Sequence, residues 1–266
     1  MKKKYFLISL LVLVFIGLSQ EKAKAQWQFT ITEMADSAAV VELVKTVFLD
    51  GVSPSQYQNV QFKGDPRSVG YYTNGYFLGF SKPQGIVMST GFAGNLDKDN
   101  ACGPFESGNT SGGSDPDLVT ANNGGGINDA CVIEFDFKPA GDSVKFNYVF
   151  GSEEYHEWVS PLFADVFGFF LSGPGINGNY TNNGINIAEV PGTHQPVSIG
   201  TVNCGDQNAD CTPPPGSGPN CEFLYDNTNS AQGTFYQTTL DAYTVPFVAD
   251  NGVQSCKWYP HETCSR

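Results

Sequence analysis

The stretch Tyr148-Val149-Phe150-Gly151-Ser152-Glu153-Glu154-Tyr155 and a second stretch, Asp165-Val166-Phe167-Gly168-Phe169-Phe170-Leu171-Ser172-Gly173-Pro174, decide the fold of this chain. Both are dominated by aromatic and aliphatic residues, so each predicts a buried strand. The loop between the two strands is acidic and begins with Glu153 and Glu154. A carboxylate without a partner beside so much apolar surface is costly, so these glutamates are expected to have one.

Two alternating patterns upstream of the acidic loop predict a β-hairpin. Apolar and polar residues alternate over 131–137 and again over 143–150, which is typical of strands with one buried face. The turn of this hairpin would be Pro139-Ala140-Gly141-Asp142. The segment Asp165–Leu171 is apolar on both faces and is therefore expected to be a central strand.

A single clear helix is predicted near the N-terminus. Its apolar stripe follows the i, i+3, i+4 spacing through Val40, Leu43, Val44, Val47 and Phe48. Either Asp36 or Ser37 can cap the start of this helix, and Gly51 can end it.

Short strands separated by Gly, Asn, Asp and Pro clusters make up most of the remaining chain. They are expected near Gln58–Phe62, Tyr76–Phe80, Gly85–Thr90, Val197–Val202, Thr234–Leu240 and Tyr243–Val248. This arrangement predicts a mainly β fold, an antiparallel β-sandwich or jelly-roll-like domain with one N-terminal helix. The irregular segment Leu96–Asn128 is long enough that a task or a bound ligand is expected for it.

The N-terminus has the pattern of a secretory signal peptide. Lys2, Lys3 and Lys4 precede an apolar core, and Ala23-Lys24-Ala25 is a small-x-small cleavage site. Residues 1–25 are therefore expected to be removed near Ala25, which leaves a secreted or cell-surface chain. A membrane span is the alternative, but the apolar core is short for one, and no second spanning segment follows.

Charge limits the partners of the mature chain. Removal of residues 1–25 lowers Lys+Arg from 14 to 9 and Asp+Glu from 27 to 26, which gives a net charge of −17. An acidic chain of this kind repels nucleic acid and anionic membrane surfaces. It is compatible with cation binding and with a solvated extracellular surface.

Seven cysteines in an exported chain predict disulfide bonds. Six of them are expected to pair, and they are Cys102, Cys131, Cys204, Cys211, Cys221 and Cys256. A bond between Cys102 and Cys131 would close the Gly-rich loop between them. A second bond is expected within the cluster of Cys204, Cys211 and Cys221.

Seven carboxylates are candidate calcium ligands, because calcium takes six to eight oxygen ligands from Asp, Glu, Asn and backbone carbonyls. They are Asp97, Asp99, Asp115, Asp117, Glu153, Glu154 and Asp165. The alternative for the four aspartates in the Asn- and Gly-rich loop is that each caps its own turn. The alternative for the two glutamates is hydrogen bonding to loop amides.

The sequence gives less support to a catalytic function. Two carboxyls at a defined separation could hydrolyse a sugar, but Glu153 and Glu154 are adjacent and would point to opposite faces of a strand. His156 and His194 have no zinc-ligand spacing. The chain is therefore expected to be non-catalytic, with a glycosidase as the alternative.

The two quoted stretches resemble the choice-of-anchor L domain, a family of secreted and surface proteins of Bacteroidota-type bacteria. The likeness covers roughly Ala35 to Tyr259 and includes Gly85-Ile86-Val87-Met88-Ser89-Thr90-Gly91, Asn186-Ile187-Ala188 and Val190-Pro191-Gly192-Thr193. It implies one domain over residues 26–259. It also implies a surface adhesin or interaction module related to attachment or gliding motility, whose ligand is an extracellular surface or a glycan, and calcium is the ion expected to stabilise it. The alternative is a secreted carbohydrate-active protein, either a glycan-binding module or a hydrolase.

The last residues depart from the family pattern. Relatives continue after Cys256-Lys257-Trp258-Tyr259 with a strand that resembles His-apolar-Lys-Leu-Ala, whereas this chain reads Pro260-His261-Glu262-Thr263-Cys264-Ser265-Arg266. Codons that encode these seven residues can yield His-Met-Lys-Leu-Ala-Val after a shift of one base. Residues 260–266 are therefore expected to be a frameshifted tail on a truncated domain.

Overall fold

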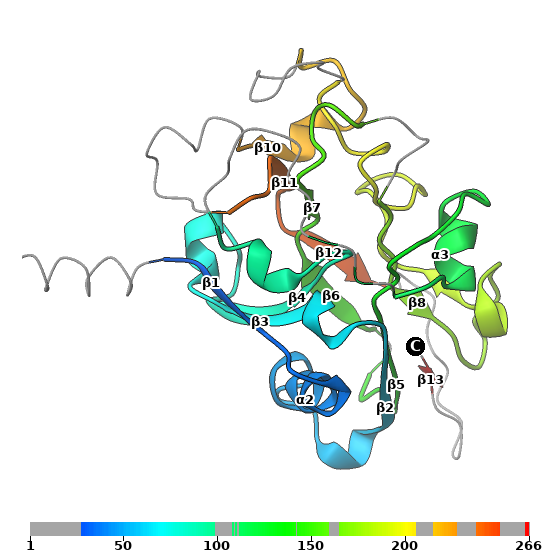
Figure 1. Ribbon diagram of the computed structural model, residues 1–266. Helices are drawn as coiled ribbons and strands as arrows, with labels where there is room; N and C mark the ends of the chain where they lie inside the picture. Colours follow the sequence, from blue (N-terminus) through cyan, green and yellow to red (C-terminus); the bar gives the residue numbers. More distant parts are fainter. Residues whose placement is uncertain are drawn as a thin grey trace, which may run out of the picture.

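The computed structural model describes residues 28–98, 108, 110, 112–141, 143–159, 165–205, 215–227, 238–250 and 264–265. The predicted signal peptide lies outside the described residues, as does most of the predicted C-terminal tail. Within them the fold is mainly β and every strand pair is antiparallel (Figure 1), as the sequence predicts.

Five small sheets carry the strands. Their orders are β1-β3-β4, β10-β11-β7, β12-β6, β13-β5-β2 and β8-β9. The strands are β1 (Thr30–Glu33), β2 (Tyr57–Lys63), β3 (Val69–Thr73), β4 (Gln84–Met88), β5 (Val132–Phe137), β6 (Lys145–Tyr148), β7 (Gly151–Ser152), β8 (Phe170–Leu171), β9 (Ile185–Asn186), β10 (Leu224–Asp226), β11 (Ala242–Thr244), β12 (Phe247–Asp250) and β13 (Cys264–Ser265). Most of these strands are short, so loops position much of the surface.

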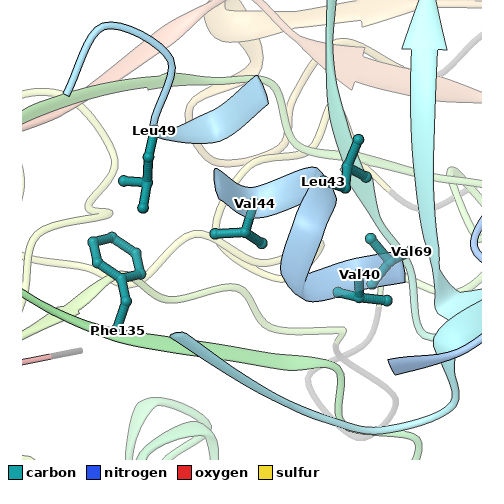
Figure 2. Close-up of a cluster of buried hydrophobic side chains, with 6 residues drawn as sticks. All are labelled: Val40, Leu43, Val44, Leu49, Val69 and Phe135. Carbon is teal, nitrogen blue, oxygen red and sulfur yellow. The ribbon is translucent and has the colours of Figure 1, made fainter. Parts of the chain in front are cut away.

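The predicted N-terminal helix forms α2 (Ser37–Leu43) and continues as a π-helical turn, Val44–Phe48. The Asp36 carboxylate accepts from the Ala39 N–H and caps its start, as expected. The predicted apolar stripe faces a buried cluster that includes Val69 of β3 and Phe135 of β5 (Figure 2). Burial of this stripe therefore joins the helix to two different sheets.

The predicted hairpin between 131–137 and 143–150 is wrong. β5 pairs with β2, and with β13 on its other edge, whereas β6 pairs with β12. β5 and β6 meet instead through side chains, because the Phe48 ring stacks on Phe146 at 5.2 Å and contacts the Phe135 ring edge-on at 6.0 Å. An aromatic side chain from the helix thus connects two strands that the sequence suggested were hydrogen-bonded to each other.

The segment expected as a central strand over Asp165–Leu171 is a strand only at its end. β8 covers Phe170–Leu171, and Val166 makes an isolated bridge to Ser198. The Phe169 N–H donates to the side-chain oxygen of Asn186 rather than to a neighbouring strand. A polar side chain therefore replaces part of the expected strand ladder.

The other strand predictions divide in a similar way. Those near Gln58–Phe62 and Gly85–Thr90 correspond to β2 and β4. Tyr243–Val248 is split into β11 and β12 around Pro246, which has no N–H to donate to a ladder. The predicted strand near Tyr76–Phe80 is mostly a 3-10 turn, Gly75–Leu78, and Val197–Val202 forms only an isolated bridge at Ser198. Most of Thr234–Leu240 lies outside the described residues.

Four Asn–Gly dipeptides lie in loops of the described chain. In each, the glycine N–H donates to a backbone carbonyl oxygen: Gly75 to Pro83, Gly124 to Val119, Gly178 to Asn183, and Gly184 to Tyr180 and Thr181. Asn74, Asn123 and Asn183 have positive φ angles of 59°, 51° and 57°. These loops are therefore held by specific backbone bonds.

Candidate functional site

The acidic turn, residues 153–158, follows directly from β7. Ser152 pairs with Ala242 of β11, and the Ser152 hydroxyl accepts from the Glu154 N–H. The Trp158 N–H then donates to the Glu154 carbonyl and closes the turn. The sheet thus fixes where the two glutamates predicted from the sequence leave it.

Tyr155 anchors this turn in the core. Its side chain is fully buried against Ile199 and Ala242, and its hydroxyl donates to the Val202 carbonyl. These contacts fix the backbone position next to Glu154.

Glu154 lies in an unfavourable environment for a charge. Its Oε2 atom is buried and accepts no hydrogen bond from the described residues. Burial, followed by the nearby carboxylates of Asp165 and Glu153, raises its pKa to about 7. Burial, and then the Asp129 carboxylate, also raises the pKa of Asp165. Glu153, Glu154 and Asp165 therefore lie close enough to interact.

A buried histidine lies in the same turn. His156 is 1% exposed, and its Nε2 atom is 3.6 Å from Oδ1 of Asp226 on β10. Neither ring nitrogen makes a hydrogen bond within the described residues. The ring therefore lies within ion-pair distance of Asp226 but makes no hydrogen bond within the described residues.

The other candidate carboxylates do not join this cluster. Asp97 accepts from the Ile31 N–H at 2.7 Å, next to β1. Asp115 caps α3 (Pro116–Ala121) by accepting from the N–H groups of Asp117 and Leu118. Asp115 therefore caps its own turn, which is the alternative to metal binding that the sequence left open, whereas Asp97 binds backbone 66 residues away in the chain.

Asp117 makes the most complete of these contacts. It is 1% exposed, and its Oδ1 atom accepts from both the N–H and the hydroxyl of Thr181, each at 2.7 Å. These bonds join α3 to a loop 64 residues further along the chain. Asp117 is therefore a structural link between distant segments.

The described residues contain no group of three or more His, Cys, Asp or Glu side chains that could hold a metal ion. Asp99 lies outside them. Calcium binding by the seven predicted carboxylates stays a prediction, and the six described ones are divided among separate places in the fold.

The family profile described as Choice-of-anchor L domain matches residues 30–261. The match covers most of the chain. The chain belongs to the choice-of-anchor L family. This family indicates a surface-associated module, as the sequence resemblance implied.

No curated protein and no solved structure matches this choice-of-anchor L domain. Among the helices in the part of the chain that the structure describes, none is long and apolar enough to cross a membrane.

The choice-of-anchor L domain contains a disulfide bond between Cys204 and Cys221, which confirms that a pair forms within the predicted cysteine cluster. Cys131 carries a free thiol, so the predicted bond to Cys102 is wrong. The Cys131 side chain packs against the helix cluster instead, and burial raises the pKa of its thiol to about 11. Cys102, Cys211 and Cys256 lie outside the described residues.

Among the residues that the structure describes, most aromatic side chains contribute to the core, but three are prominently exposed. Tyr76 is 63% exposed, Tyr225 53% and Trp158 48%. Tyr225 lies on β10 and contacts the ring of Tyr243 on β11, whereas Trp158 belongs to the acidic turn. Exposed rings of this kind are frequent anchors in protein and glycan recognition.

The sequence did not reveal several partners in this region. Asp129 faces Asp165 from the loop before β5, and Asp226 reaches His156 from β10. Thr181 is bound by Asp117 although no local pattern connects them. These contacts depend on the long-range path of the chain.

Proposed function

We propose that this chain is a non-catalytic interaction module that attaches to an extracellular surface or glycan, in adhesion or gliding. Membership of the choice-of-anchor L family carries this proposal. The contacts support it, because Asp97, Asp115 and Asp117 bind backbone groups of their own fold. Such carboxylates stabilise a scaffold and are not presented to a substrate.

The exposed aromatic residues are the contact points that this function would use. Trp158, Tyr225 and Tyr76 offer large rings at the surface, and most of the binding energy of an interface comes from a few such residues. The acidic charge of the mature chain favours neutral or cationic partners over anionic ones.

The proposal is tested by measuring whether the purified chain binds a glycan array, and whether it binds fluorescent beads that stand in for an extracellular surface. The purified mature chain should bind without altering its ligand, and Trp158→Ala or Tyr225→Ala should weaken binding about tenfold if that ring is an anchor. Val52→Ala is the matched control, since Val52 is 38% exposed but aliphatic. If Trp158→Ala, Tyr225→Ala and the control all bind as the parent chain does, neither of these two rings is a contact point.

A glycoside hydrolase is the second candidate, and one observation favours it. A general acid at neutral pH needs a raised pKa, and that of Glu154 is about 7 with two carboxyls nearby. Release of reducing sugar that Glu154→Gln abolishes and Glu222→Gln preserves would establish this alternative, since Glu222 is an exposed acid on another element. Absence of turnover on every bound glycan supports the non-catalytic module.

A further inference from the structure

One loop contains two of the four Asn–Gly dipeptides in the part of the chain that the structure describes. Asn177-Gly178 and Asn183-Gly184 bracket a tight turn between β8 and β9. Both asparagines are exposed, so water reaches their side chains. Asn–Gly is the sequence most open to deamidation, because glycine leaves the following amide nitrogen unshielded.

Deamidation begins when the glycine nitrogen attacks the asparagine side-chain carbonyl carbon. A C–N bond forms, and ammonia leaves with the proton that the glycine nitrogen loses. Water then opens the succinimide ring on either side and gives aspartate or isoaspartate. The attack requires a free glycine N–H and a backbone that can turn this nitrogen toward the side chain.

In the native loop, hydrogen bonds occupy the glycine N–H groups and hold the backbone in place, so neither requirement for the attack is met. The Gly178 N–H donates to the Asn183 carbonyl at 2.8 Å, and the Gly184 N–H donates to the carbonyls of Tyr180 and Thr181. The Tyr180 N–H returns a bond to the Gly184 carbonyl. A Cβ atom on Gly178 would lie 2.1 Å from the Gly184 carbonyl oxygen, so the two halves of the loop are in close contact.

Asp117 holds this loop in place from outside. Its buried carboxylate binds the N–H and hydroxyl of Thr181, which lies between the two dipeptides. The rate of deamidation in a folded protein follows the fraction of time that the loop is open. Loss of the Asp117 contact should therefore expose both dipeptides together.

We propose that Asn177 and Asn183 are latent modification sites that the Asp117–Thr181 contact protects. When the loop opens, both asparagines can deamidate to aspartate or isoaspartate. Each conversion adds a negative charge within a loop that Asp117 contacts. The modified loop should close less readily, which makes the change self-sustaining. This inference does not depend on the proposed interaction function.

Site-resolved mass spectrometry during incubation at mildly alkaline pH tests this proposal. In the intact chain both sites should react much more slowly than the same dipeptides in the urea-unfolded chain. Thr181→Val removes one bond to Asp117 and should raise deamidation of Asn177 and Asn183 roughly fivefold. Asp117→Ala should raise it further.

Asn74–Gly75 provides the control within the same molecules. It lies between β3 and β4, its glycine N–H bonds to Pro83, and it makes no contact with the Asp117 loop that would change in these variants. Its rate should stay the same in Thr181→Val, which shows that the variant is still folded. Equal rates for all sites in native and unfolded chain would overturn the proposal, as would a Thr181→Val variant that leaves Asn177 and Asn183 unchanged.

Discussion

Two regions of the domain surround a carboxylate with opposite kinds of neighbour, hydrogen-bond donors in one and other carboxylates in the other. At the junction of α3 with the Thr181 loop, Asp117 is almost completely buried and receives two short hydrogen bonds. In the acidic turn after β7, Glu154 is less buried, yet its Oε2 atom receives none and Asp165 and Glu153 face it. The donors that surround a carboxylate, more than its depth, decide whether its charge stabilises the fold.

The largest expected effect is the loss of Asp117. Asp117→Ala leaves the Thr181 N–H and hydroxyl without their acceptor, and it should lower the free energy of unfolding by roughly 3 kcal/mol. Urea denaturation followed by fluorescence measures this. Asp117→Asn keeps one acceptor oxygen and should lose less. An Asp117→Ala variant as stable as the parent would mean that the hydrogen bonds to Asp117 do not stabilise the fold. The proposed difference between Asp117 and Glu154 would then be wrong.

Thr181→Val tests the same contact by removing one of the two hydrogen-bond donors to Asp117. The valine removes the hydroxyl bond but keeps the backbone N–H bond, so the expected loss is about 1 kcal/mol. The same urea titration provides the value. A double variant with Asp117→Ala should cost little more than Asp117→Ala alone, because both changes act on one contact. Full additivity would mean that the two residues act separately.

Asp115→Ala tests whether the short helix that carries Asp117 depends on its cap. Asp115 accepts from two N–H groups at the start of α3, and loss of an N-cap costs about 1 kcal/mol. Asp36→Ala at α2 is the matched control, since that aspartate caps a longer helix that is also held by core packing. Thermal unfolding of both variants gives the comparison, and a loss at α2 greater than at α3 would contradict it.

Glu154→Gln should have the smallest effect, and it should have the opposite sign. The pKa of Glu154 is raised from 4.5 to about 7 in the folded chain, so the folded state binds a proton more tightly than the unfolded state does. The carboxyl therefore lowers stability as pH rises from its unfolded pKa through its folded pKa. At about pH 8 the glutamine variant should be more stable by at most about 1 kcal/mol, since solvent screens a partly exposed group.

Melting temperatures on both sides of this window check the sign. The gain from Glu154→Gln should vanish at about pH 4, where the parent carboxyl is protonated in both states. Glu222→Gln, at an exposed acid on another element, is the matched control. A stabilising response of the parent to calcium at high pH that Glu154→Gln abolishes would instead place a cation at the acidic turn.

The sequence predicted what depends on local pattern. The apolar stripe of α2 and the Asp36 cap follow from residues within one helix, and both are confirmed. The β5–β6 hairpin was wrong because its short connection suggested a local pairing, whereas the actual partners β2 and β12 lie far away in the chain. Alternation identifies a strand but does not identify its neighbour.

The candidate site follows the same rule. Glu153, Glu154 and Asp165 interact electrostatically in the fold, whereas their joint role as calcium ligands stays a prediction. Asp97, Asp115 and Asp117 were grouped with them only because Asp is common in calcium loops, but each binds backbone elsewhere. A single sequence shows which side chains can accept a hydrogen bond, and the fold determines which donors reach them.

The bond between Cys204 and Cys221 has a mechanical consequence for a module that works outside the cell. These cysteines are 17 positions apart, and a fully extended chain of that length spans roughly 55–60 Å. Tension applied along the polypeptide crosses the sulfur bridge and bypasses the enclosed segment. A pulling force does not extend that segment, so the domain lengthens on unfolding by less than its number of residues suggests. A ligand contact made within the segment would not bear the force.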